Sequence, residues 1–146
     1  MRVLLSASAC AIIHWSAVVG WTLASPPPVK TLKAAAVLGL SGSAAYHAQA
    51  IRRGLEIAAK ELRAEGWDVE LKFEDDQTNP AQTASSMHYL LSGGYRFFVG
   101  PTWSFQVNAV RAVLASQDAV ALIPAGSSDI NGGLIEGVFN SLSTAR

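Results

Sequence analysis

Hydroxyl side chains stand just beyond the ends of three separate apolar runs in this sequence. Ser41, Ser104 and Ser127 each follow such a run within a few residues, close to glycine or proline. A hydroxyl beside free backbone N–H groups at a helix start is well suited to bind a carboxylate or another small anion. Any one of these loops alone is more typical of an ordinary turn. Three of them at one edge of a sheet would favour a binding site.

The residues that could support catalysis are few and isolated. Asp75 and Asp76 form one acidic pair, which without a partner lysine or third carboxylate is typical of a solvated turn. His47 and His88 stand alone, as surface or packing histidines commonly do. The sequence contains no G-x-S-x-G, P-loop or G-x-G-x-x-G motif. We therefore expect a protein that is not an enzyme, with no cofactor and no metal site.

Composition narrows the class of protein further. Half of the 146 residues are apolar and 15% are charged, with 11 basic side chains against 11 acidic ones. This composition excludes a disordered tail and gives no reason to expect nucleic acid as a partner. The length suits one layered core. The single cysteine, Cys10, excludes an internal disulfide.

The N-terminal segment has the features of a secretory signal. Arg2 provides a positive start, residues 3–21 are mostly apolar, and the Thr-Leu-Ala that ends at Ala24 has small residues at the −3 and −1 positions. We predict a signal peptide over 1–24, a linker over 25–33, and a location in the periplasm or outside the cell. An uncleaved membrane anchor and a lipoprotein attached at Cys10 are the weaker alternatives.

Beyond this segment, short apolar runs alternate with amphipathic ones. An apolar stripe over 46–64 has helical spacing and would end at Gly66, while Asn79–Pro80 supplies the cap and first residue of another helix. Apolar and charged residues alternate over 69–74, which indicates a strand at a sheet edge. We expect strands over 34–40, 69–74, 95–99, 119–123 and 137–140, and helices over 46–64, 80–91 and, capped by Ser104, 107–114.

This alternation predicts a doubly wound α/β fold, in which residues 34–146 form a parallel sheet with helices on both faces. In such sheets a ligand binds beyond the carboxyl ends of the strands, where the strand order reverses. The candidate hydroxyls all follow predicted strands. The fold therefore places them at the edge where a ligand is expected.

The order of the motifs resembles that of the N-terminal lobe of the type I periplasmic binding proteins. More narrowly, the sequence is similar to the branched-chain amino-acid (leucine/isoleucine/valine) substrate-binding subunits of ABC importers. The resemblance covers about residues 33–143 and depends on the order and spacing of several modest motifs. These are Leu40–Gly42, Arg53–Ala58, Glu74–Pro80, Phe98–Pro101 and Ile123–Ser128.

The resemblance implies how a ligand would be held. In this family an amino acid lies between two lobes, and the first lobe binds most of its α-carboxylate and α-ammonium. Ser104 would bind the carboxylate, Ala125 would offer its carbonyl to the ammonium, and Ser127 would add a hydroxyl and an amide. Tyr46 would lie against the side of the ligand. Trp103 departs from the family pattern and could shrink the pocket or stack on an aromatic ligand.

The resemblance also implies partners, namely a small-molecule ligand and the permease subunits of an ABC transporter at the membrane. Two other functions compete with this one. The first is an extracellular ligand-sensing lobe of a receptor, and the second is a small secreted α/β enzyme that uses Ser104 or Asp76. Since a two-lobed protein needs a second lobe, we expect residues 34–146 to be part of a first lobe that holds half of a site.

Overall fold

The computed structural model describes residues 29–124 and 137–141, so the predicted signal over 1–24 lies outside the described residues. Strands and helices alternate along the described chain. The strands are β1 (Lys30–Leu38), β2 (Trp67–Asp75), β3 (Phe97–Val99), β4 (Val120–Ile123) and β5 (Val138–Asn140). The helical elements are the short 3-10 turn η1 (Gly42–Ala44), α1 (Ala45–Ala64), α2 (Pro80–Ser92) and α3 (Ser104–Ser116).

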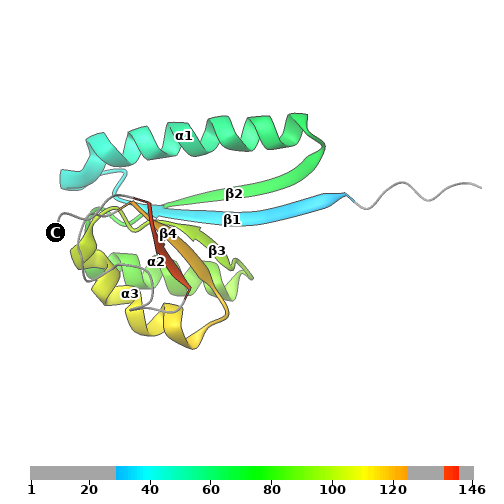
Figure 1. The fold of residues 1–146 in the computed structure, drawn as a ribbon. Helices are drawn as coiled ribbons and strands as arrows, with labels where there is room; N and C mark the ends of the chain where they lie inside the picture. Colours follow the sequence, from blue (N-terminus) through cyan, green and yellow to red (C-terminus); the bar gives the residue numbers. More distant parts are fainter. Residues whose placement is uncertain (1–28, 125–136, 142–146) are drawn as a thin grey trace, which may run out of the picture.

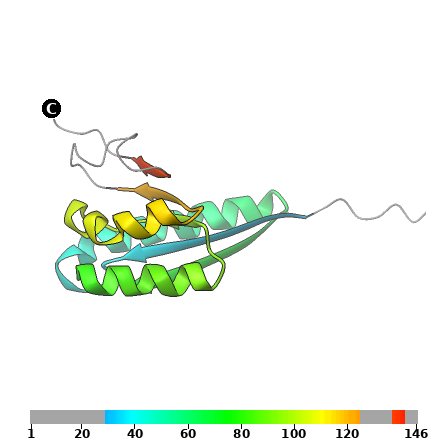
Figure 2. The same ribbon diagram turned by 90° about the horizontal axis from the view of Figure 1, so that it is seen from below.

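The strands form one parallel sheet in the order β2-β1-β3-β4-β5. α1 lies on one face of the sheet, and α2 and α3 pack against each other on the opposite face (Figure 1, Figure 2). The predicted doubly wound α/β fold is therefore confirmed, including the position of β2 at an edge. Because β2 and β3 flank β1 on opposite sides, the strand order reverses between β1 and β3.

Two groups of buried side chains hold the layers together, and β1 contributes to both. Ala35 and Val37 belong to a large cluster under α2 and α3, whereas Ala36 and Leu38 belong to a smaller cluster under α1. Successive side chains of a strand point to opposite faces, so an apolar run of this kind needs cover on both faces. The large cluster also contains Met87, Leu90, Val107, Val110, Leu114 and Ile123.

Strand β1 begins at Lys30, before the apolar run that predicts it, and ends at Leu38 rather than at Leu40. It pairs in register with the whole of β2, from Lys30 opposite Trp67 to Leu38 opposite Asp75. Backbone groups form this ladder whatever the side chains are, so polar residues at its start do not end it. The Lys30 ammonium also lies 5.2 Å from the centroid of the Trp67 ring, a favourable cation–π distance.

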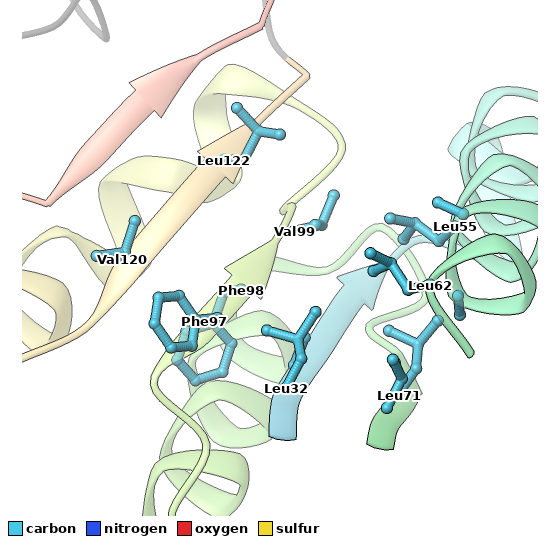
Figure 3. Close-up of a pocket in the computed structure, with 13 residues that line it drawn as sticks. Leu32, Leu55, Leu62, Leu71, Phe97, Phe98, Val99, Val120 and Leu122 are labelled. Carbon is cyan, nitrogen blue, oxygen red and sulfur yellow. The ribbon is translucent and has the colours of Figure 1, made fainter. Parts of the chain in front are cut away.

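Part of the sheet surface is apolar and open. On the face that carries α1, Phe97 of β3 and Leu122 of β4 are 53% and 44% exposed. A groove of about 300 Å³ runs between these strands and α1, with Leu55 and Leu62 on the helix side (Figure 3). An exposed apolar patch of this kind favours association with other apolar surfaces.

We predict that the double substitution Phe97→Thr and Leu122→Thr reduces self-association of the chain with little loss of stability. Both side chains are largely exposed, and threonine keeps the preference for strands. Light scattering and binding of a hydrophobic dye would measure the change. Phe105→Gln is the matched control, because Phe105 is also 53% exposed but lies on α3. Unchanged association in the double variant would contradict the prediction.

Candidate functional site

Three loops meet at the carboxyl edge of the sheet, beyond β1, β2 and β3. The Gly39 amide donates to the Thr102 hydroxyl at 3.2 Å, which joins the loops after β1 and β3. The Thr78 hydroxyl, in the loop after β2, accepts from the Ala44 amide and donates to the Ser41 carbonyl, both at 3.1 Å. A Cβ atom at Gly39 would lie 2.5 Å from the Thr78 hydroxyl, so this approach requires glycine. Of the three hydroxyl-bearing loops predicted to share this edge, those after β1 and β3 meet here, joined also by the loop after β2, and the loop with Ser127 lies outside the described residues.

The Asp75 carboxylate fastens the loop after β1 from the side of β2. It accepts hydrogen bonds from the Ser41 hydroxyl at 2.6 Å and from the Ser41 and Gln77 amides at 3.1 and 2.9 Å. Burial alone would raise the pKa of this carboxyl, but the hydrogen bonds outweigh burial and hold its pKa below the ordinary value. Gln77 and Thr78 have left-handed φ angles of 53° and 59°, a strained pair that these contacts hold in place.

Asp76 is fully buried, and the prediction that it lies in a solvated turn is wrong. Its Oδ1 accepts from the Thr78 amide at 2.9 Å, and its Oδ2 accepts from the Thr83 hydroxyl at 3.0 Å and the Gln106 side-chain amide at 2.7 Å. A buried carboxylate persists only where such donors replace water. Because Gln106 lies on α3 and Thr83 on α2, no local sequence pattern indicates this network.

Gln106 extends the buried network to the start of α3. Its Nε2 also donates to the Thr83 hydroxyl at 2.9 Å, and its Oε1 accepts from the Trp103 amide at 3.2 Å. A glutamine that reaches back from the third helical position to the residue before the helix forms half of a capping box. The prediction that Ser104 caps this helix is therefore wrong. Trp103 occupies the cap position with extended backbone, and Ser104 is the first helical residue.

Aromatic rings bring the starts of α1 and α3 together. The His47 ring packs edge to face against Trp103 with centroids 5.5 Å apart, and against Tyr46 at 5.4 Å. Tyr46 and His47 belong to the first turn of α1, whereas Trp103 directly precedes α3. His47 is thus a packing residue, one of the two roles expected for it, but its partner Trp103 could not be predicted because the contact joins two distant segments and leaves no local signal.

Two of the four predicted ligand-binding residues fall within the described structure. Tyr46 is 84% exposed at the start of α1, and Ser104 is half-buried at the start of α3. Both lie at the carboxyl edge of the sheet, as predicted. Ala125 and Ser127 lie outside the described residues.

A hollow of about 370 Å³ opens at this edge, between α1 and the loops after β3 and β4. Its size and its mainly apolar lining suit a small organic molecule. In the described part of the chain, no three metal-ligating side chains group together, and no helix is both long and apolar enough to span a membrane. The residues that line the hollow are His47, Ala50, Ile51, Thr102, Trp103 and Pro124.

Comparison with protein families identifies the chain. The family model described as periplasmic binding protein matches residues 31–141. The chain belongs to the periplasmic binding protein family. Its members are solute-binding proteins, and the match covers nearly the same residues as the resemblance drawn from the motifs. No curated protein matches the sequence of the chain.

Solved structures share the fold of this periplasmic binding protein. The branched-chain amino acid transporter substrate-binding protein LivJ from Streptococcus pneumoniae, in complex with isoleucine, has a TM-score of 0.70 and 24% identity, covering 79% of this chain and 34% of that one. A solute-binding protein of an ABC transporter from Rhodopseudomonas palustris, in complex with 3,4-dihydroxy benzoic acid, has a TM-score of 0.71 and 17% identity, over 78% and 32%. An ABC transporter substrate-binding protein from Desulfitobacterium hafniense, in complex with Leu, has a TM-score of 0.67 and 17% identity, over 79% and 35%. The chain thus spans about a third of the length of each.

We predict that Asp76→Ala lowers the free energy of unfolding by about 1–3 kcal/mol, because it removes the acceptor of the Thr78 amide and of one N–H of the buried Gln106 side chain. Urea denaturation would measure the loss. Asp68→Ala, which removes an exposed carboxylate from β2, is the control and should cost much less. Combining Asp76→Ala with Gln106→Leu should cost less than the sum of the two single changes, since both remove one shared hydrogen bond. Strict additivity would contradict the network.

Proposed function

We propose that this chain forms the first lobe of an extracytoplasmic solute-binding protein that delivers an amino acid, or a related small carboxylate, to an ABC importer. The observation that carries the proposal is the position of Ser104. It opens α3 beside an apolar hollow, at the edge where the strand order reverses. Because Trp103 occupies the cap position and Ser104 is the first helical residue, the Ser104 hydroxyl does not cap the helix and remains suited to a ligand.

The start of α3 supplies the chemistry for a carboxylate. First-turn amides carry the partial positive charge of the helix dipole, and a hydroxyl beside them adds a charge-assisted hydrogen bond. We assign the ligand carboxylate to Ser104 and the side of the ligand to Tyr46. Ala125 and Ser127 would receive the ammonium and complete the polar contacts. Relatives solved with isoleucine and with Leu support an amino-acid ligand.

The second half of the site would come from a second lobe. The chain corresponds to about a third of the relatives' length, and closure of two lobes over a ligand removes water and adds contacts. For residues 25–146 alone we therefore expect amino-acid affinities no tighter than about millimolar. The closed two-lobed form would be the state that the permease subunits recognise.

We predict that Ser104→Ala weakens binding of the best amino-acid ligand by about tenfold or more, because a hydrogen bond to a charged group contributes roughly 1.5–3 kcal/mol. NMR titration detects millimolar binding, so the chain can be titrated with leucine, phenylalanine and glutamine in turn. Ser85→Ala is the matched control, since the Ser85 hydroxyl donates to the Ala81 carbonyl on α2. If no amino acid shifted the resonances of Trp103 and Ser104, the proposed site would be wrong.

The location of the protein has its own test. Residues 1–24 carry a positive start, an apolar stretch and small residues before Ser25, so we predict export and cleavage by signal peptidase. N-terminal sequencing of the exported chain should find Ser25 as its first residue. Exported protein that retained Met1 would refute cleavage and favour a membrane anchor.

A further inference from the structure

The hollow beside Ser104 has an aromatic side that the proposed function leaves unexplained. Trp103 and His47 line it and pack edge to face, and Tyr46 extends the row of rings along the start of α1. Trp103 is 37% exposed and Tyr46 is 84% exposed. Neighbouring aromatic side chains that are exposed at the carboxyl edge of a sheet are more typical of a ligand-binding surface than of core packing.

Among the described residues, the rest of the lining offers few polar groups. Ala50, Ile51 and Pro124 are apolar, and Thr102 is buried with its hydroxyl accepting a hydrogen bond from the Gly39 amide. The described part of the lining therefore favours an apolar group on the ligand, apart from any group that meets His47. At about 370 Å³ the hollow exceeds the roughly 150 Å³ that is enough to hold a benzene ring in an apolar cavity.

We propose that the hollow receives the planar ring of an aromatic carboxylate, so that this chain selects ring-bearing acids over branched aliphatic ones. The proposal rests on the proposed function, because it takes the carboxylate to lie at Ser104. Trp103 directly precedes Ser104 in the chain, so a ring against Trp103 and a carboxylate at the helix start can belong to one small molecule. Free aromatic acids and aromatic amino acids share this chemistry.

Aromatic rings attract one another beyond the effect of buried area alone, through edge-to-face and offset-stacked contacts. An aliphatic ring of similar size lacks this attraction but is more hydrophobic. Benzoate and cyclohexanecarboxylate therefore distinguish a hollow that recognises aromatic rings from one that is only hydrophobic. A site that recognises aromatic rings binds benzoate more tightly, whereas a site that is only hydrophobic binds cyclohexanecarboxylate at least as tightly as benzoate.

The experiment is an NMR titration of the chain with benzoate, cyclohexanecarboxylate, phenylalanine and leucine, read from the indole N–H resonance of Trp103 and the amide of Ser104. We expect benzoate to bind more tightly than cyclohexanecarboxylate, and phenylalanine more tightly than leucine. Trp103→Leu should reduce affinity for benzoate by about two- to tenfold and abolish the preference for the aromatic ring. His47→Leu should reduce the preference as well. Binding of benzoate but not of phenylalanine would identify free aromatic acids as the ligands, and the reverse would identify amino acids.

Phe105→Leu is the control, since Phe105 is exposed next to Ser104 but does not line the hollow. It should leave the preference for benzoate unchanged, and circular dichroism would verify that each variant folds. Equal or tighter binding of cyclohexanecarboxylate, with shifts at Ser104, would overturn the aromatic proposal and leave the proposed function intact. If neither acid nor either amino acid shifted these resonances, the proposed function itself would fail.

Discussion

A buried carboxylate organises the carboxyl edge of this sheet. Asp76 has no access to water, and the donors that stabilise it come from the β2–α2 loop, from α2 and from α3. A buried carboxylate is costly unless hydrogen bonds replace its contacts with water. The elements that donate to Asp76 therefore cannot separate without leaving its carboxylate without hydrogen-bond donors. Gln106 links this network to the start of α3, because its Oε1 accepts a hydrogen bond from the Trp103 amide. One carboxylate thus determines where the helix start that bears Ser104 is held.

The neighbouring carboxylate organises the other side of the same edge. Asp75 binds Ser41, and the Thr78 hydroxyl bridges to the loop after β1, while Gly39 reaches the loop after β3. The three loops therefore form one hydrogen-bonded body rather than three independent turns. Binding groups on such a body lose little conformational entropy when a ligand arrives, which is the advantage of a preorganised site.

The two faces of the sheet differ in how completely they are covered. Under α2 and α3 the core is continuous, whereas on the opposite face α1 leaves Phe97 and Leu122 open. A parallel sheet is stable with cover on both faces, and the relatives with this fold are more than twice as long as this chain. The open groove lies on the face of the sheet that carries α1, so it is separate from the hollow at the carboxyl edge.

The sequence alone was sufficient to determine the order of the elements, the doubly wound fold, the edge position of β2 and the helix start at Asn79–Pro80. Hydrophobic periodicity and turn residues depend on neighbouring residues in the chain, so they can be recognised in the sequence before the fold is known. The same information placed Ser104 and Tyr46 at the carboxyl edge of the sheet, where the structure also has them. The burial of Asp76, the cap formed by Trp103 and Gln106, and the contact between His47 and Trp103 were decided only by the tertiary structure. Each of these features joins residues far apart in the chain, and contacts between distant segments leave no pattern in either segment by itself.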